Sequence, residues 1–178
     1  ERAKGGVGLI ITGGISPNRQ GWLAPLGGTL NRHLDIFNHR QVTKAVHAHN
    51  GKILLQILHA GRYGYHPFVI SSSAIKSPIS AFKPKEMSHH NIIATIDDFA
   101  NTAYLAQKSG YDGIEVMGSE GYLISQFLSA SVNHRQDEWG GDIIGRMKLA
   151  ISIVTAIRQK VGANFIICFR LSMLDLVQ

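Results

Sequence analysis

The sequence predicts an α/β fold, and within that class it favours a (β/α)₈ TIM barrel of which the chain covers roughly strands 2 to 5. Short β-rich runs alternate with amphipathic segments in the order β–α–β–α–β–α–β. The strand runs are apolar on both faces, which is typical of parallel strands covered by helices. Polar residues also occur inside or at the ends of the strands, at Gln56, Glu115 and Arg170. In a barrel, such side chains meet at one mouth, so they favour the barrel over a doubly wound sheet.

The glycine pattern supports the same choice. No Gly-x-Gly-x-x-Gly opens a helix after a strand, so the sequence lacks the dinucleotide-binding fingerprint that a doubly wound fold often carries. A full barrel takes about 250 residues. The chain has 178 residues, so we expect residues 1–178 to form one partial barrel domain, with the first strand and the last strands outside it.

Each strand and helix is predicted from its local pattern. The strands are expected where short apolar runs end in glycine or polar residues, at residues 7–12, 52–58, 113–116 and 164–171. The helices are expected where apolar residues recur at helical spacing, at residues 39–49, 92–109 and 143–161. Ser88 is the expected N-cap of the second helix and Gly110 its C-terminal stop. A further short helix is expected to begin at Tyr122, above the mouth.

One apolar face of each long helix is expected to pack against the sheet. In the first helix this face consists of Val42, Ala45 and Val46. In the second helix it consists of Ile92, Ile96, Phe99, Ala100, Ala103 and Ala106. In the third helix it consists of Ile144, Met147, Ala150, Ile151, Val154 and Ile157.

Composition and charge limit the classes of partner. The chain carries 18 Lys and Arg residues against 12 Asp and Glu residues, a formal net charge of +6. These basic residues are scattered along the chain, so no nucleic-acid partner is expected. Their distribution is more consistent with an anionic cofactor or substrate. The apolar runs fall far short of the ~20 residues of a membrane span, so no membrane association is expected. The single cysteine, Cys168, excludes a disulfide framework and fits a reducing, cytoplasmic compartment. No histidine–carboxylate pair has the spacing of a metal site, so no metal ligands are expected.

Three polar residues are the main candidates for chemistry. Gln56 lies in an apolar strand, where its amide is either a satisfied core group or a donor and acceptor for a planar heterocycle. Arg170 either pairs with Glu115 or presents a fixed positive charge to an electron-accepting ring. Tyr122 is either a packing aromatic or a neutral proton donor for a developing carbanion, because a phenol has a pKa of about 10. The segment His59–Arg62 follows the second strand, so its side chains are expected to line the mouth.

Four motifs resemble, in this order along the chain, those of the Old Yellow Enzyme family of flavin-dependent ene-reductases. They are Leu55–Arg62, Gly110–Glu115, Gly121–Leu128 and Asn133–Asp142. The segments 116–122 and 169–175 most resemble the acyl-CoA branch of the family, the NADPH-dependent 2,4-dienoyl-CoA reductases of bacteria. Simple ene-reductases of the family usually carry a histidine and an asparagine or histidine where this chain has Met117 and Glu120, which also favours the acyl-CoA branch.

The resemblance implies an FMN-binding (β/α)₈ barrel and assigns a role to five residues. Gln56 would hydrogen-bond the pyrimidine edge of the flavin, and Arg170 would lie beside its N1 and O2 and favour the reduced anion. Gly14, at the end of the first strand, would contact the FMN. Tyr122 would be the proton donor, and Glu120 would be a neighbour that tunes or orients it.

The implied reaction is the reduction of the activated C=C bond of 2,4-dienoyl-CoA with NADPH-derived electrons, in unsaturated fatty-acid β-oxidation. The acyl-CoA would be the small-molecule partner. In full-length members of the family, FAD, a [4Fe–4S] cluster and NADPH bind outside this segment, and a histidine that pairs with the tyrosine lies on a later strand. We therefore expect residues 1–178 alone to be inactive and to hold FMN weakly or not at all. Acyl-chain preference and oligomeric state are not predicted.

Three alternatives remain at this point. The chain could belong to another oxidoreductase of the same family, such as an ene-reductase or an amine dehydrogenase. It could be a non-redox barrel fragment that binds a phosphorylated ligand, or a purely structural piece. The flavin hypothesis requires that Gln56, Tyr122 and Arg170 converge on a single cavity.

Overall fold

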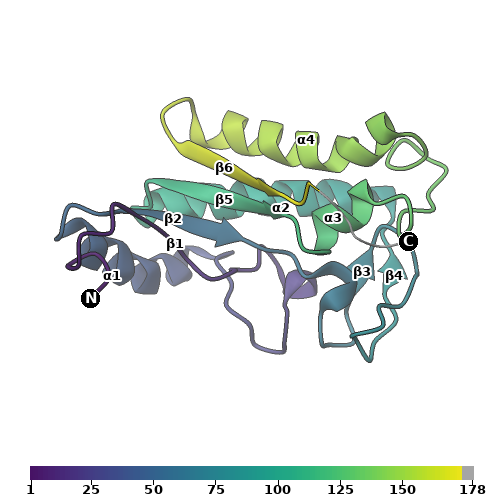
Figure 1. Cartoon of the computed structure of the whole chain (residues 1–178), viewed down its shortest axis with the longest axis horizontal. Coiled ribbons are helices and arrows are strands. Elements are labelled where there is room, and N and C mark those ends of the chain that lie inside the picture. The colour runs from purple at the N-terminus through teal and green to yellow at the C-terminus, as the bar shows by residue number, and fades with distance from the viewer. Residues whose placement is uncertain (174–178) are drawn as a thin grey trace.

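The computed structural model describes residues 1–173, and a four-stranded parallel sheet forms its centre (Figure 1). The strands follow the order β1 (Leu9–Ile11), β2 (Lys52–Ile57), β5 (Gly113–Gly118) and β6 (Ile166–Leu171). In this register Gln56 pairs with Glu115, and Glu115 pairs with Cys168. Paired residues of parallel neighbours face the same side of a sheet, so the polar residues of three strands point to one face.

The helices α1 (Ile36–His47), α2 (His89–Lys108) and α4 (Ile143–Val161) connect these strands. Side chains from all three helices share one apolar core with the outward-facing strand residues: Val46, Phe99 and Ile153 pack in the same cluster as Leu55 and Ile114. The strands follow the chain without reversal and the helices cover one face, as in a barrel, whereas a doubly wound sheet has helices on both faces. The expected fold class is therefore confirmed as a parallel half-barrel. Within residues 1–173, no helix combines the length and apolar character that a bilayer crossing requires.

The segments that follow the carboxyl ends of the strands form a layer at one end of the sheet. This layer contains a short helix, α3 (Leu123–Leu128), and a small second sheet of β3 (Ile70–Ser71) and β4 (Lys85–Glu86). Figure 1 shows β3, β4 and α3 beyond the arrowheads of β2 and β5. Three 3₁₀ turns complete it: η1 (Arg19–Gly21), η2 (His33–Asp35) and η3 (Gly61–Tyr63).

The predicted features of α2 are confirmed. Ser88 caps the helix, since its hydroxyl accepts a hydrogen bond from the backbone N–H of Asn91, and the chain leaves the helix at Gly110 with a φ of 88°. Every residue of the expected apolar face is buried. The helix begins at His89, three residues before the predicted start, because the cap precedes the first apolar residue by a full turn.

The predicted packing face of α4 is wrong for most of its residues, although Ile157 is buried as predicted and the bounds of the helix are confirmed. The buried side chains are Leu149, Ile153, Ile157 and Val161. By contrast Ile144 is 71% exposed and Ile151 is 55% exposed. This helix has two apolar faces, and the second borders an open apolar groove of about 550 Å³ beside Phe169 and Leu171 of β6. Apolar periodicity cannot tell which of two apolar faces packs inward, so this information was missing from the sequence.

The other differences are small. Of the predicted face of α1 only Val46 is buried, together with Thr43, whose hydroxyl donates to the carbonyl of Ser109 at 2.7 Å. Strand β5 runs two residues beyond its predicted end, to Gly118, where a Cβ would lie 2.4 Å from the ring of Phe169. Glu115 is consequently in the middle of a strand rather than at its end. The motif at 169–175 is described as far as Met173, and its last two residues lie outside the described residues.

We expect the core on the helical side of the sheet to dominate stability. Phe99 is fully buried on α2, whereas Phe37, on α1, is 76% exposed. Phe99→Ala should lower the free energy of unfolding by about 3–5 kcal/mol, because it removes apolar contacts and leaves a cavity. Phe37→Ala should change it by less than about 0.5 kcal/mol. Urea denaturation of both variants checks the difference, and equal losses would contradict this description of the core.

Candidate functional site

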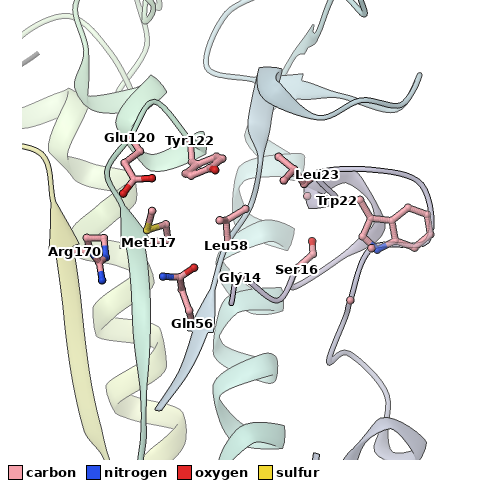
Figure 2. Close-up of a pocket in the computed structure, with 13 residues that line it drawn as sticks. Gly14, Ser16, Trp22, Leu23, Gln56, Leu58, Met117, Glu120, Tyr122 and Arg170 are labelled. Carbon is pink, nitrogen blue, oxygen red and sulfur yellow. The ribbon is translucent and has the colours of Figure 1, made fainter. Parts of the chain in front are cut away.

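One pocket of about 410 Å³ lies at the carboxyl ends of the four strands (Figure 2). Its walls come from the loop after β1, the end of β2, the loop after β5, and β6. All five residues that the resemblance singled out line it: Gly14, Gln56, Glu120, Tyr122 and Arg170. In Figure 2, Gln56 lies lowest along the strands, Met117 and Leu58 lie above it, and Glu120 and Tyr122 lie at the strand ends. The convergence that the flavin hypothesis requires is therefore present.

The floor of the pocket is a hydrogen-bonded group that spans three strands. Gln56 Nε2 donates to Glu115 Oε1 at 2.7 Å, and Arg170 donates to both carboxylate oxygens, from Nε at 3.1 Å and from Nη2 at 3.2 Å. The hydrogen bonds and the charge of Glu115 raise the pKa of Arg170 above its ordinary value. The expected ion pair is thus present, and Gln56 and Arg170 face the pocket as well, so the structural and the functional interpretations of these residues are compatible.

The loop after β1 approaches Gln56 closely at Gly14. A Cβ at this position would lie 2.7 Å from Leu58 Cδ1 and 3.2 Å from Gln56 Oε1. The neighbouring Ile15 continues the pairing with β2, because its N–H donates to the carbonyl of Gln56 at 2.9 Å. A glycine is therefore required for the backbone to form this wall of the pocket.

Tyr122 and Glu120 come from the turn between β5 and α3. Glu120 has a φ of 60° and Gly121 a φ of 80°, so the backbone turns sharply before Tyr122 begins α3 as its N-cap residue. The N–H of Glu120 donates to Ser172 Oγ at 3.0 Å, which holds this turn against the end of β6. Burial, together with the charge of Glu120 and the nearby Tyr63, raises the pKa of Tyr122. The phenol is therefore neutral and retains its proton at physiological pH.

Two residues that support Tyr122 were not among the predicted site residues. The ring of Tyr63 meets that of Tyr122 edge to face, with centroids 6.0 Å apart. Gln126 is buried in α3 and makes four hydrogen bonds: Nε2 donates to the carbonyls of Gly121 at 2.7 Å and of Ala60 at 3.3 Å, and Oε1 accepts from Arg62 N and from Ser71 Oγ, both at 3.0 Å. Its signal in the sequence is an amide inside a short apolar helix, where a buried polar group needs partners.

No residue of His59–Arg62 lines the pocket, contrary to expectation, and His59 is buried. Its side chain is 1% exposed, and Nδ1 accepts a hydrogen bond from the N–H of Gly61 at 3.1 Å. Burial lowers the pKa of His59 to about 3, so the ring is neutral. The chain turns into η3 at Gly61, whose φ is 59°, and this turn directs the histidine inward.

A buried arginine links the chain directly after β3 and β4 to the loop between α3 and α4. The Arg135 guanidinium pairs with Asp137 and donates to the carbonyls of Ser72 and Met87. Hydrogen bonding to Arg135 lowers the pKa of Asp137 below its usual range. Among residues 1–173, no group of three or more His, Cys, Asp or Glu side chains is placed to hold a metal ion.

Comparisons with known proteins agree with this architecture. A sequence profile described as "NADH:flavin oxidoreductase / NADH oxidase family" matches residues 1–178. An N,N-dimethylglycine/sarcosine dehydrogenase from Chromohalobacter salexigens is 37% identical over 96% of this chain and 26% of its own length. An NADPH dehydrogenase from a Geobacillus species is 38% identical over 89% of this chain and 47% of its own length. The chain therefore spans between about a quarter and a half of these curated relatives.

A solved structure shows the same fold. A 2-naphthoyl-CoA reductase in complex with 2-naphthoyl-CoA superposes with a TM-score of 0.87 and 29% sequence identity, over 94% of this chain and 28% of that chain. The four-stranded sheet with its helices therefore matches a half-barrel within that larger chain.

The four hydrogen bonds of Gln126 predict a large effect of its removal. Gln126→Leu keeps the approximate volume but leaves buried partners unpaired, so we expect a loss of at least about 2 kcal/mol in the free energy of unfolding. Gln107→Leu is the matched control, because that half-buried amide makes one hydrogen bond, to the carbonyl of Val161. It should cost less than about 1 kcal/mol. Equal losses in urea denaturation would show that Gln126 does not hold the mouth together.

Proposed function

The chain belongs to the NADH:flavin oxidoreductase / NADH oxidase family, and we propose that its pocket holds FMN and that the full-length protein reduces the activated C=C bond of a 2,4-dienoyl-CoA. The observation that carries the proposal is the convergence of Gln56, Tyr122 and Arg170 on one pocket at the carboxyl ends of parallel strands. This end of the strands is where TIM-barrel enzymes place their active sites.

The residues of the pocket fit the ring system of FMN. A planar heterocycle with alternating donors and acceptors on one edge suits an amide, which offers both. Gln56 presents its amide from the floor, and Arg170 adds N–H donors and a positive charge beside it. Gly14 leaves the backbone wall open next to that amide, where a side chain would collide with Leu58. The pocket volume of about 410 Å³ lies within the usual range for small-molecule sites.

FMN bound in this pocket would supply hydride transfer to and from carbon. The residues of the pocket would bind the ring and supply the proton. Gln56 and Arg170 would hold the edge of the ring, and Arg170 would favour extra negative charge there. Tyr122 holds a proton at Oη, at the open end of the pocket, and donates it to the carbanion that forms on the substrate. Its raised pKa keeps that proton in place until the substrate charge develops.

Two observations favour an acyl-CoA thioester as the substrate. Met117 and Glu120 line the pocket where simple ene-reductases of the family usually carry the residues that grip a small carbonyl compound. The solved relative with a TM-score of 0.87 is a reductase in complex with an aromatic acyl-CoA. We place the reaction in unsaturated fatty-acid β-oxidation in the cytoplasm. Electrons would come from NADPH through FAD and a [4Fe–4S] cluster, all bound outside residues 1–178.

An amine dehydrogenase is the second candidate. It is favoured by the 37% identity to the N,N-dimethylglycine/sarcosine dehydrogenase and by Glu120, a carboxylate in the pocket wall that suits a cationic amine. The two reactions run in opposite directions, because the amine is oxidised whereas the dienoyl thioester is reduced. Steady-state assays of the full-length protein with 2,4-hexadienoyl-CoA and NADPH, with dimethylglycine and an electron acceptor, and with cyclohexenone and NADPH distinguish them. Turnover of the amine or the enone alone would overturn the dienoyl-CoA assignment.

Removal of the Tyr122 hydroxyl tests the proposed proton donor. Tyr122→Phe should lower kcat with 2,4-hexadienoyl-CoA by about 10²–10⁴-fold, with a much smaller change in KM, because the proton transfer is lost while binding surface remains. Any loss of activity through ionisation of Tyr122 should be centred at a higher pH than for an ordinary phenol, because burial raises its pKa.

A tyrosine outside the pocket provides the control for this experiment. Tyr104→Phe alters a tyrosine on α2 that contacts Lys108 and Lys160, and it should leave kcat unchanged. Full activity of Tyr122→Phe would exclude Tyr122 as the proton donor.

A further inference from the structure

Glu115 lies directly beneath the pocket without reaching it. The residue is 2% exposed and is absent from the pocket lining, although both of its partners, Gln56 and Arg170, belong to that lining. Its carboxylate accepts three hydrogen bonds from them, at 2.7, 3.1 and 3.2 Å. Glu115 therefore reaches a bound ring by contact only through the amide and the guanidinium, whereas its charge also acts on the ring across them.

The first effect concerns the orientation of the Gln56 amide. An ionised carboxylate can only accept hydrogen bonds, so the NH₂ group of Gln56 must face Glu115 and the carbonyl oxygen must face away. Figure 2 shows the nitrogen turned toward Arg170 and the oxygen turned toward Gly14. The amide consequently presents a hydrogen-bond acceptor on the side of Gly14, and an imide N–H at the edge of a heterocycle is its complement.

The second effect concerns the charge of the site. Arg170 directs Nε and Nη2 at Glu115, so its positive charge is compensated by a carboxylate 3.1 Å away. The Arg170 side chain remains 45% exposed, whereas that of Glu115 is 3% exposed. A bound ring that gains negative charge is attracted by the Arg170 guanidinium. The carboxylate of Glu115, on the other side of that guanidinium, partly cancels the attraction. Removal of the carboxylate charge would expose the full positive charge to the ring.

From this arrangement we infer that Glu115 is a positioning residue that sets the relative affinity of the site for oxidised and reduced flavin. It fixes the Gln56 acceptor toward the ring, and it limits the attraction of Arg170 for the reduced, negatively charged form. The ring consequently remains a good hydride donor, because a site that binds the reduced form too tightly holds back the electrons. The inference rests on the proposed FMN site.

The test measures FMN binding by the full-length protein rather than turnover. Glu115→Gln keeps the shape of the side chain, removes its charge and adds an NH₂ group that faces other donors. We expect the ratio of the Kd for reduced FMN to the Kd for oxidised FMN to fall by about tenfold, since one nearby negative charge is lost. The ratio follows from the midpoint potentials of free and bound FMN in a dye-equilibration titration.

A carboxylate away from the pocket provides the matched control. Glu138→Gln removes a carboxylate that is also paired, with Lys148 and His89, and that does not line the pocket. The ratio should remain at the wild-type value in this variant. A wild-type ratio in an FMN-binding Glu115→Gln protein would overturn the inference.

Two further outcomes are decisive. If Glu115→Gln does not fold, Glu115→Asp is measured in its place. Its shorter side chain moves the carboxylate away from Arg170, so the ratio of the two Kd values should fall by about two- to threefold. An unchanged ratio would overturn the inference. A wild-type protein without affinity for FMN would instead contradict the proposed function itself.

Discussion

The carboxylate of Glu115 joins three neighbouring strands at the level where the pocket begins. It accepts hydrogen bonds from the Gln56 amide on β2 and from the Arg170 guanidinium on β6, and it lies on β5 between them. A buried charge of this kind is stable only when its partners are close and well aligned, which constrains the register of all three strands. The same alignment brings Gln56 and Arg170 to the pocket floor, so the constraint that stabilises the sheet also builds the candidate site.

A large part of this architecture was predictable because it depends on local patterns. The parallel order followed from strands that are apolar on both faces, and the packing of α2 followed from a single apolar face with Ser88 as its cap. The convergence of Gln56, Tyr122 and Arg170 could not be predicted from local patterns alone, because these residues are far apart in the sequence. The barrel hypothesis made that step possible, because the ends of parallel strands meet at one edge.

The remaining features depend on contacts that no local pattern contains. Two apolar faces of α4 compete, and only the position of α2 decides that Leu149 and Ile153 pack inward. His59 follows a strand and is nevertheless buried, because the positive φ of Gly61 turns the chain at once. Gln126 acts through partners in three separate segments, and its role becomes visible only when those segments lie side by side.

The hydrogen bond from the Glu120 backbone to Ser172 links the end of β6 to the turn that carries Tyr122. A hydrogen bond between two such segments couples their local opening, because the departure of either segment breaks it. The amide proton of Glu120 is therefore held in a hydrogen bond for as long as Ser172, directly after β6, stays in place. Local opening at the β6 edge of the sheet would therefore also loosen the turn that carries Tyr122.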